Sequence, residues 1–334
     1  MNPLVSVIVP VFNGANFVRS AIESVLAQTF TDFEVVVLDD ASTDESADIV
    51  QSLRDPRIRL LRHPKNLGLV ATLNDLVREA RGMWLARQDH DDLSAPGRLE
   101  RQLREARTSE DVVAVFSDAR LISSNGGYRG RMRTPLDDLS VRWELCHRNP
   151  FPHTSAFLKR DAVVAEGGYS DLRSCEDYEL WTRLLSRGTI RSVKDCLVQY
   201  RQHAGSIMAQ EHGANSGLHR SVLRSVASEH LRRTFGVDPE RFAPVLDCWH
   251  LGEAVSWPDY FGAQQELERL VRVGGAGSDG FRSVVADQDY TLFCRLWRRS
   301  KVDAWAFLSG LWRFSRERFL GLPWHRMGAM ILAR

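Results

Sequence analysis

The stretch Leu4–Phe12 reads LVSVIVPVF, an almost unbroken run of apolar and β-branched residues. Such a run is typical of a strand that is buried on both faces, as in a parallel sheet covered by helices. Phe33–Leu38, with the sequence FEVVVL, predicts a second strand of this kind. Phe17–Ala27 lies between the two and carries apolar residues at helical spacing. The N-terminus is therefore predicted to form a strand, a helix and a second, parallel strand.

The same alternation continues to about residue 118. Further strands are predicted at Ile58–Arg62, Met83–Arg87 and Val112–Ser117, and helices from Ser42 to about Arg54, within Asn66–Arg81 and at Pro96–Arg107. The first of these helices is expected to begin with a capping box, Ser42-Thr43-Asp44-Glu45. This order is typical of an α/β fold with a mostly parallel central sheet flanked by helices.

The pattern changes after Asp118. Asn125-Gly126-Gly127 indicates a hairpin turn. Short strands are predicted at Thr154–Leu158 and Leu197–Arg201, and helices at Val141–His147, Arg160–Glu166 and Glu176–Ser186. From about Ser216 helical periodicity dominates. We expect one domain over residues 1–212 and a helical C-terminal region over 216–334.

The composition excludes several classes of protein. The chain has 334 residues, of which 43% are hydrophobic and 26% charged, the mix of a globular protein. Its 44 basic and 43 acidic residues leave a net charge of +1, so nucleic acid is not expected as a partner. The five cysteines include no C-x-x-C spacing, which favours a reducing compartment. The sequence lacks an export signal and an 18-residue apolar run, so we expect a cytoplasmic protein.

Polar side chains follow three of the predicted strands. Asn13 follows the first, Asp39 and Asp40 the second, and Asp89-His90-Asp91-Asp92 the fourth. In parallel sheets, ligands bind at the carboxyl ends of the strands. The last cluster offers hard oxygen ligands suited to Mg²⁺ or Mn²⁺, which would hold a diphosphate leaving group. The alternative is that this cluster only caps the following helix, although one cap needs one carboxylate.

Other charged residues allow two interpretations from spacing alone. Asp40 either accepts hydrogen bonds from a base or ribose or belongs to a helix cap. Glu176-Asp177 either supplies a base for a substrate hydroxyl or fills the first turn of a helix. Arg201 and His203 either reach a phosphate group or metal or lie in a solvated loop.

Six segments in this order resemble the family-2 glycosyltransferases, which have the GT-A fold, over about residues 4–210. They are VSVIVPVFN at Val5–Asn13, VVLDDAST at Val36–Thr43, NLGL at Asn66–Leu69, ARQDHDDLSAPGRLERQ at Ala86–Gln102, GGYSDLRSCEDYELWTRLL at Gly167–Leu185 and YRQHAGSI at Tyr200–Ile207. The resemblance implies a Rossmann-like α/β domain over 1–212, with a nucleotide-binding half at 1–118 and an acceptor half at 119–212. It also implies a sugar-nucleotide-dependent transferase that inverts the anomeric centre.

The resemblance also implies a role for individual residues on the donor side. Asp40 matches the position that binds the nucleotide base, and Asp39 stands beside it. The other donor-binding residues are expected to be Pro10, Phe12, Asn13, Asn66, Gly68, Asp89 and Arg201. Asp91 is expected to contact Mn²⁺ or Mg²⁺, with Asp92 and His203 as further ligands.

On the acceptor side, Asp177 of the E-D motif is implied to be the catalytic base. Glu176 and His153 are expected near the acceptor, and a loop histidine without a role is the alternative for His153. The sequence departs from the family at Ala41, where glycine is usual, so we expect this turn to avoid a positive φ. His90 occupies the variable middle position of D-x-D.

Together these expectations describe an inverting, metal-dependent transferase. It would move a sugar from a nucleotide-diphosphate donor, a UDP-sugar, to a hydroxyl of a glycan or lipid-linked acceptor in bacterial cell-surface glycan synthesis. A sugar-nucleotide pyrophosphorylase is one alternative, but Asn13-Gly14-Ala15-Asn16 lacks the Gly-rich basic loop that it needs. A non-catalytic nucleotide-sugar-binding or scaffold protein is another, against which intact Asp91 and Asp177 argue.

The C-terminal region lies outside the resemblance. It carries six of the nine tryptophans, Trp249, Trp257, Trp297, Trp305, Trp312 and Trp324. Ala304–Leu322 is expected to place Trp305, Leu308 and Trp312, with Phe319 and Leu322, along one helical face. Six basic residues against two acidic ones from Lys301 onward would let this face lie on an anionic membrane. The alternative is that it packs on the catalytic domain or forms a dimer interface. The oligomeric state is left open.

Overall fold

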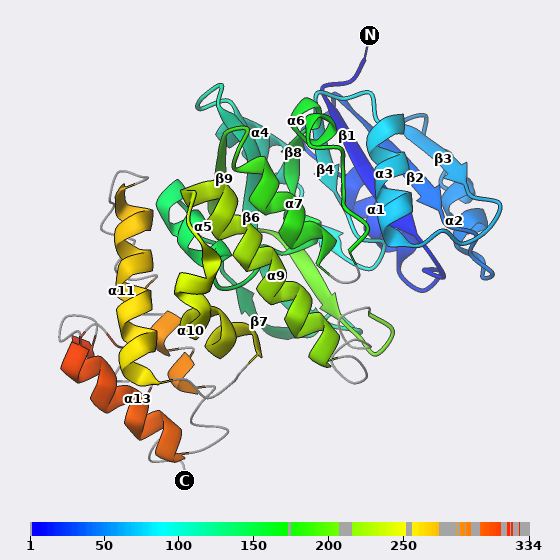
Figure 1. The fold of residues 1–334 in the computed structure, drawn as a ribbon. Coiled ribbons are helices and arrows are strands. Elements are labelled where there is room, and N and C mark those ends of the chain that lie inside the picture. The colour runs from blue at the N-terminus through cyan, green and yellow to red at the C-terminus, as the bar shows by residue number, and fades with distance from the viewer. Residues whose placement is uncertain are drawn as a thin grey trace. The chain divides into compact units, whose positions relative to one another are not determined.

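The two apolar runs at the N-terminus form neighbouring strands of a nine-stranded sheet in the computed structural model of the chain (Figure 1). The structure describes residues 2–172, 175–206, 216–251, 256–273, 285, 288–290, 292–294, 301–314, 319–320, 322 and 327. Two compact units result, one of residues 1–136 with 149–222 and the other of residues 137–148 with 223–334. We call them the sheet unit and the helical unit.

The strands of the sheet unit follow the order β3-β2-β1-β4-β8-β6-β9-β5, and β7 pairs with the end of β6. Their bounds are Val5–Val11 (β1), Phe33–Asp39 (β2), Ile58–Arg62 (β3), Trp84–Arg87 (β4), Leu93–Ser94 (β5), Val112–Ser123 (β6), Tyr128–Met132 (β7), Phe157–Lys159 (β8) and Thr189–Gln202 (β9). Strands β1 to β4 are mutually parallel, β8 is antiparallel to β4 and β6, and β9 is parallel to β6. The mostly parallel sheet is thus confirmed, and the segment after residue 118 supplies its antiparallel partners.

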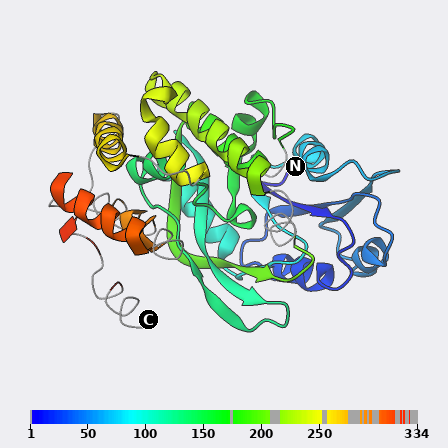
Figure 2. The ribbon, with the colours of Figure 1, turned by 60° about the horizontal axis from the view of Figure 1, so that its bottom comes forward.

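Helices cover both faces of this sheet. Helices α1 (Val18–Leu26), α2 (Ser46–Ser52) and α4 (Arg98–Ala106) share one apolar core with alternate residues of β1 and β2. Helix α3 (Leu69–Glu79) contacts α6 (Arg160–Ala165), which contacts α7 (Glu176–Leu184). In Figure 2 the dark blue α1 and α2 lie on the opposite side of the blue strands from the lighter blue α3. Both faces of β1 and β2 are therefore buried, as their continuous apolar sequences predict.

The turn after β2 differs from the prediction in two ways. Helix α2 begins at Ser46 rather than Ser42, so the predicted capping box does not form. The Ser42 hydroxyl instead accepts a hydrogen bond of 2.9 Å from the Asn13 backbone N–H, 29 residues away. Ala41 has a φ of +58°, so the expectation that this turn avoids a positive φ was wrong. The Cβ of an L-residue in this region costs about 1–2 kcal/mol.

The helical unit includes one segment that the sequence assigned to the acceptor half. Helix α5 (Asp138–Leu145) places Leu139 and Trp143 in the apolar core of this unit, together with Ala227, Phe261 and Phe307. Its other elements are α9 (Ser216–Phe235) from residue 223 onward, the 3₁₀ turn η2 (Pro239–Phe242), α10 (Ala243–Leu246), the π-turn η3 (Asp247–Leu251), α11 (Trp257–Val273) and α13 (Lys301–Phe314). Residues 213–215, between the two predicted regions, lie outside the described residues.

The predicted apolar face of α13 is only partly buried. Leu308 is buried in the core of the helical unit, whereas Trp305 is 56% exposed and Trp312 is 42% exposed. Because Leu308 is three residues from Trp305 and four from Trp312, all three lie on one side of α13, with Leu308 at its buried margin and the tryptophans at its exposed margin. Among the described residues, every helix is too short or too polar to cross a membrane.

Candidate active site

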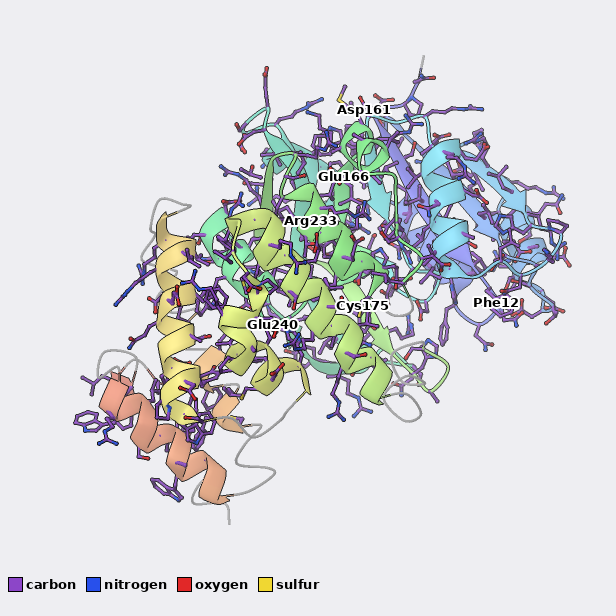
Figure 3. The ribbon with its side chains drawn as sticks, in the orientation of Figure 1. Phe12, Asp161, Glu166, Cys175, Arg233 and Glu240 are labelled. Atoms are coloured by element: carbon purple, nitrogen blue, oxygen red, sulfur yellow. The ribbon has the colours of Figure 1, made fainter. Side chains whose placement is uncertain are left out.

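The loops at the carboxyl ends of β1 and β2 are tied together by side-chain hydrogen bonds. Asn13 has a φ of +49°, and its side-chain oxygen accepts from the Thr43 N–H at 2.9 Å. In return, the Ser46 hydroxyl accepts from the Gly14 N–H at 2.8 Å. Phe12, which is 45% exposed, points outward beside this junction (Figure 3). Pro10 is buried within β1, opposite Leu38 in the sheet.

Asp39 and Asp40 are both buried and both have protein partners. Asp39 forms an ion pair of 2.8 Å with Arg62. Asp40 accepts hydrogen bonds of 2.9 Å from the Leu67 and Gly68 N–H groups, and its Oδ1 lies 2.7 Å from the His63 ring. Asp40 thus anchors the NLGL segment to the end of the sheet, a contact that spacing along the chain does not show.

This anchoring exposes a second apolar side chain near Asp40. Leu67 is 44% exposed, and its own N–H is bonded to the Asp40 carboxylate. Phe12 follows Val11, whose carbonyl accepts from the Asp40 N–H at 2.8 Å. Phe12 and Leu67 therefore flank Asp40. Asn66, the neighbour of Leu67, is exposed. Sequence reasoning singled out Asn66 and Gly68 in this segment but missed Leu67.

The D-x-D loop follows β4, and its three carboxylates have different surroundings. Asp89 accepts a hydrogen bond of 2.6 Å from the buried Arg87 guanidinium. Asp91 Oδ2 lies 2.8 Å from His203 Nε2, across 112 residues of sequence. Asp92 is 1% exposed and accepts from the Arg201 N–H at 2.7 Å. Burial raises the pKa of Asp92 well above its ordinary range, and the charges of Asp89 and Asp91 add to this.

Arg201 braces this loop rather than extending into solvent. Its Nε donates to the Asp91 carbonyl at 2.7 Å, and its Nη1 donates to the Ser124 carbonyl at 2.9 Å. The guanidinium carbon lies 4.9 Å from the centre of the Phe17 ring, and the His203 ring lies 5.0 Å from the same ring. Arg201 thus holds together the D-x-D loop and the turn after β6.

A buried arginine, Arg98, supports the D-x-D loop from the protein interior. Its guanidinium donates to the side chains of Gln88 and Ser94 and to the Arg87 carbonyl, at distances of 3.1, 2.9 and 2.7 Å. Burial lowers the pKa of Arg98 to about 9, and the charge of Arg87 acts in the same direction. The segment RLERQ could have indicated this brace, but its charges alone predict only a polar helix.

Asp91 and His203 offer an oxygen and a nitrogen ligand to one cation. Among the described residues, no three His, Cys, Asp or Glu side chains are grouped as a complete metal site. Mg²⁺ and related ions are usually held by one or two carboxylates, with substrate phosphates and water completing the shell. The pair therefore fits a metal that arrives with a diphosphate, and Asp92 lies behind it as the partner of Arg201.

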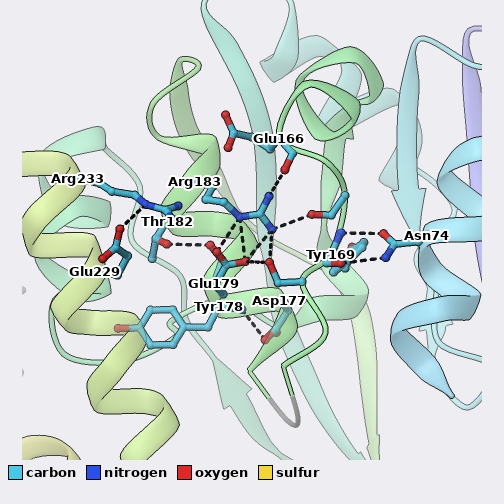
Figure 4. A network of polar contacts seen from close by, with 12 residues as sticks. Asn74, Glu166, Tyr169, Asp177, Tyr178, Glu179, Thr182, Arg183, Glu229 and Arg233 are labelled. Atoms are coloured by element: carbon cyan, nitrogen blue, oxygen red, sulfur yellow. Dashed lines mark hydrogen bonds and ion pairs between the residues drawn. The ribbon is translucent and has the colours of Figure 1, made fainter.

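Asp177 lies in the first turn of α7 (Figure 4). It accepts hydrogen bonds from the Tyr178 N–H at 2.6 Å and from the Asn149 side chain at 2.8 Å. Burial raises the pKa of Asp177 to about 6, whereas these two hydrogen bonds and the charge of Arg87 act against the rise. A carboxylate with this pKa is ionised at neutral pH and is more basic than an ordinary one.

Helix α7 is fixed in place by a second polar network. Arg183 donates to Glu179 at 2.7 Å and to the Gly168 carbonyl at 2.7 Å (Figure 4). The loop before α7 is tied to α3, because Asn74 exchanges two hydrogen bonds with the Tyr169 backbone. These contacts hold the start of α7, and Asp177 with it, against the sheet unit.

The residues expected near the acceptor are partly buried. His153 Nε2 lies 3.0 Å from the Tyr169 hydroxyl, and burial, followed by the charge of Arg87, lowers the pKa of His153 to about 3. The ring is therefore neutral at pH 7. Burial also raises the pKa of Tyr169 above its ordinary value. Glu176 is 9% exposed, and the His90 ring lies against the Gly14 backbone.

Comparisons with known proteins identify relatives of this chain. The family model described as glycosyl transferase family 2 matches residues 6–165. The O-antigen biosynthesis glycosyltransferase WbnJ of Escherichia coli is 30% identical over 209 residues, which are 60% of this chain and 80% of WbnJ. The putative glycosyltransferase EpsE of Bacillus subtilis is 32% identical over 193 residues, which are 56% of this chain and 68% of EpsE.

A solved structure shows that the fold is shared. Staphylococcus aureus TarS 1–349, in complex with UDP-GlcNAc, superposes with a TM-score of 0.55 at 17% identity, over 94% of this chain and 91% of that chain. This agreement confirms the expected GT-A fold. Because WbnJ and EpsE reach 30% identity over more than two thirds of their own length, the likeness extends beyond the fold. The chain belongs to glycosyl transferase family 2, and it is a glycosyltransferase.

Proposed function

We propose that this glycosyltransferase moves a sugar from UDP to a hydroxyl group of a glycan or lipid-linked acceptor, with inversion at the anomeric carbon, in bacterial cell-surface glycan synthesis. The observation that carries the proposal is Asp177, a partly buried carboxylate with a pKa of about 6 that two hydrogen bonds hold in place. The name of WbnJ supports the cell-surface role, and the UDP-GlcNAc held by TarS supports a UDP-sugar donor.

In this proposal the donor lies at the carboxyl ends of β1, β2 and β4. Phe12 and Leu67 contact the two sides of the base, and Asn13 and Asp39 shape the pocket beside them. Asp40 positions Leu67 through its two amide hydrogen bonds. Asp89, held by Arg87, lies next to the metal pair on the ribose and phosphate side.

Asp91 and His203 would hold a Mn²⁺ or Mg²⁺ ion against the diphosphate. When bound, this ion would offset the negative charge that grows on the leaving diphosphate. Arg201 holds Asp91 and His203 in position, because it donates hydrogen bonds to the Asp91 carbonyl and the Asp92 carboxylate. The chain therefore supplies both the ligands and a rigid frame for them.

Asp177 acts on the acceptor. Its carboxylate removes the proton of the incoming hydroxyl while the oxygen attacks the anomeric carbon and the bond to the diphosphate breaks. A single displacement of this kind inverts the configuration and needs no covalent intermediate. Asn149 and the Tyr178 N–H keep the carboxylate oriented, and neutral His153 and Glu176 line the approach of the acceptor.

The test is to replace Asp177 by Asn and to measure transfer and donor binding separately. Transfer of sugar should fall by several orders of magnitude, while stabilisation of the protein by a UDP-sugar with Mn²⁺ should persist. Asp161→Asn, at a side chain that is 90% exposed on α6, is the control and should leave both unchanged. Loss of donor binding with normal turnover in the Asp177 variant would reverse the assignment, and unchanged transfer in excess EDTA would exclude the metal.

We also propose that the enzyme is cytoplasmic and contacts the membrane through α13. The five cysteines are free thiols, as in a reducing compartment. Trp305 and Trp312 are exposed on one side of α13 near the exposed Arg313, a combination suited to a lipid interface. Flotation with phosphatidylglycerol vesicles should be lost in a Trp305→Gln, Trp312→Gln double variant. Equal flotation of this variant would exclude the contact.

A further inference from the structure

The hairpin formed by β6 and β7 is more positively charged than the chain as a whole. Residues 118–133 contain four arginines, Arg120, Arg129, Arg131 and Arg133, and a single acidic residue, Asp118. The whole chain, by contrast, has 44 basic and 43 acidic residues. All four arginines are exposed. Figure 2 shows the hairpin in teal at the bottom of the view.

Carboxylates of the described residues compensate only a small part of this charge. Arg131 forms an ion pair of 2.7 Å with Asp118. Within the described part of the chain, Arg120, Arg129 and Arg133 have no carboxylate within ion-pair distance. The ladder also places Arg120 directly opposite Arg131. Like charges at facing positions of a sheet destabilise it, so folding alone does not favour this arrangement.

An exposed aromatic ring lies within the same cluster. Tyr128 is 61% exposed, and the Arg120 guanidinium carbon lies 5.0 Å from the centre of its ring. An exposed aromatic face offers apolar contact area to a flat partner such as a sugar ring. Exposed guanidinium groups bind carboxylate and phosphate groups through paired hydrogen bonds. The hairpin therefore combines the two kinds of contact that an acidic sugar needs.

The hairpin is joined to the candidate active site. Arg201 donates to the Ser124 carbonyl in the hairpin turn at 2.9 Å and to the Asp91 carbonyl at 2.7 Å. The turn is thus one arginine side chain away from the D-x-D loop. Strand β7 leads away from that point and pairs only with β6 among the described strands. A chain of sugars lying along β7 would have one end near the donor site.

Charged residues on an edge strand also have a purely protective role, because they prevent pairing with other strands. That role does not require arginine, an exposed tyrosine or facing like charges. It also predicts no preference between acidic and neutral saccharides, and this difference makes the two explanations separable.

We propose that the β6–β7 hairpin is the docking surface for the acceptor, and that the acceptor is an anionic glycan bearing carboxylate or phosphate groups. The inference rests on the proposed transferase function and adds the chemical class of the acceptor. Arg129, Arg133 and Arg120 bind the acidic groups, and Tyr128 contacts a sugar ring.

The test measures binding of an oligogalacturonate and of a maltooligosaccharide of the same length to the full chain. The acidic oligosaccharide should bind, more weakly as salt rises, and the neutral one should not. In an Arg129→Gln, Arg133→Gln variant, loss of two exposed charge contacts should weaken binding about tenfold. The control is Arg81→Gln, Arg107→Gln, at exposed arginines that precede β4 and β6, and it should bind like the wild type.

Three results would overturn the proposal. They are equal affinity of the hairpin variant and the wild type, equal binding of the neutral oligosaccharide, and hairpin-dependent binding to phosphatidylglycerol vesicles without binding to the oligosaccharide. Hydrolysis of UDP-sugars with Mn²⁺ is measured on the same proteins. The hairpin variant should hydrolyse the donor like the wild type. Absence of hydrolysis in the wild type would count against the transferase proposal, whereas the oligosaccharide results bear on the hairpin alone.

Discussion

Removing the Asn149 side chain should shift the working pH range of the enzyme. Asn149 donates a 2.8 Å hydrogen bond to Asp177, and this bond favours the ionised carboxylate. A hydrogen bond to a charged group contributes about 1.5–3 kcal/mol, and one pKa unit corresponds to about 1.4 kcal/mol. Asn149→Ala should therefore raise the pKa of Asp177 from about 6 by about 1–2 units, with water replacing part of the lost bond.

The sign of the effect on activity follows from the role of the ionised form. Only the ionised carboxylate accepts a proton, so the acid limb of the kcat/KM profile should move upward, and activity should fall at pH 7 but recover at pH 9. Asn149→Asp should shift the limb further, because it adds a like charge beside Asp177. The assay is initial-rate transfer between pH 5 and 9, with melting temperature and donor binding as controls. An acid limb that stays in place in both variants, with the fold intact, would refute Asp177 as the base.

Three further predictions concern stability. The folded-state pKa of Asp177 is raised, so its ionisation opposes folding, and stability is lost as pH rises from about 4 through 6. Asp177→Asn should therefore raise the free energy of unfolding by about 2–3 kcal/mol at pH 7.5 and have little effect at pH 4, as measured by urea titration. Ala41→Gly should stabilise the fold by about 0.5–1 kcal/mol, because glycine accepts a φ of +58° but also adds entropy to the unfolded chain. Ala47→Gly inside α2 should destabilise the fold by about 1 kcal/mol, and a change of the same sign in both variants would contradict backbone strain at Ala41. Arg98→Lys should lower the unfolding free energy by about 2–4 kcal/mol, since an ammonium cannot reach all the acceptors around the guanidinium. An unchanged urea midpoint would show that the hydrogen bonds of Arg98 are not needed for stability.

The parts of the fold that were predictable are those whose sequence pattern is set by local burial. Strands β1 and β2 are buried on both faces, so their positions appear as continuous apolar runs. The predicted capping box at Ser42 was wrong because a contact with a distant part of the chain decides the role of this side chain. Its hydroxyl bonds to Asn13 across 29 residues, and a tertiary contact of this kind overrides a local helix-start signal.

The same distinction applies to the candidate site. Spacing placed the carboxylates at one edge of the sheet, but it could not show that the oxygens of Asp40 are taken up by the amides of Leu67 and Gly68. The pairing of Asp91 with His203 spans 112 residues and was expected only from the family resemblance. Helix α5 was expected in the acceptor half, but most residues of the core that contains Trp143 come from much later in the sequence, from Ala227 onward.

The most direct test of the central claim is an anomalous-diffraction measurement on crystals soaked with UDP and Mn²⁺. The account predicts one manganese peak within coordination distance of Asp91 and His203, shared with the diphosphate, and an Asp177 carboxylate that faces the open side of the nucleotide. A manganese peak away from this pair, or an Asp177 side chain turned into bulk solvent, would contradict it.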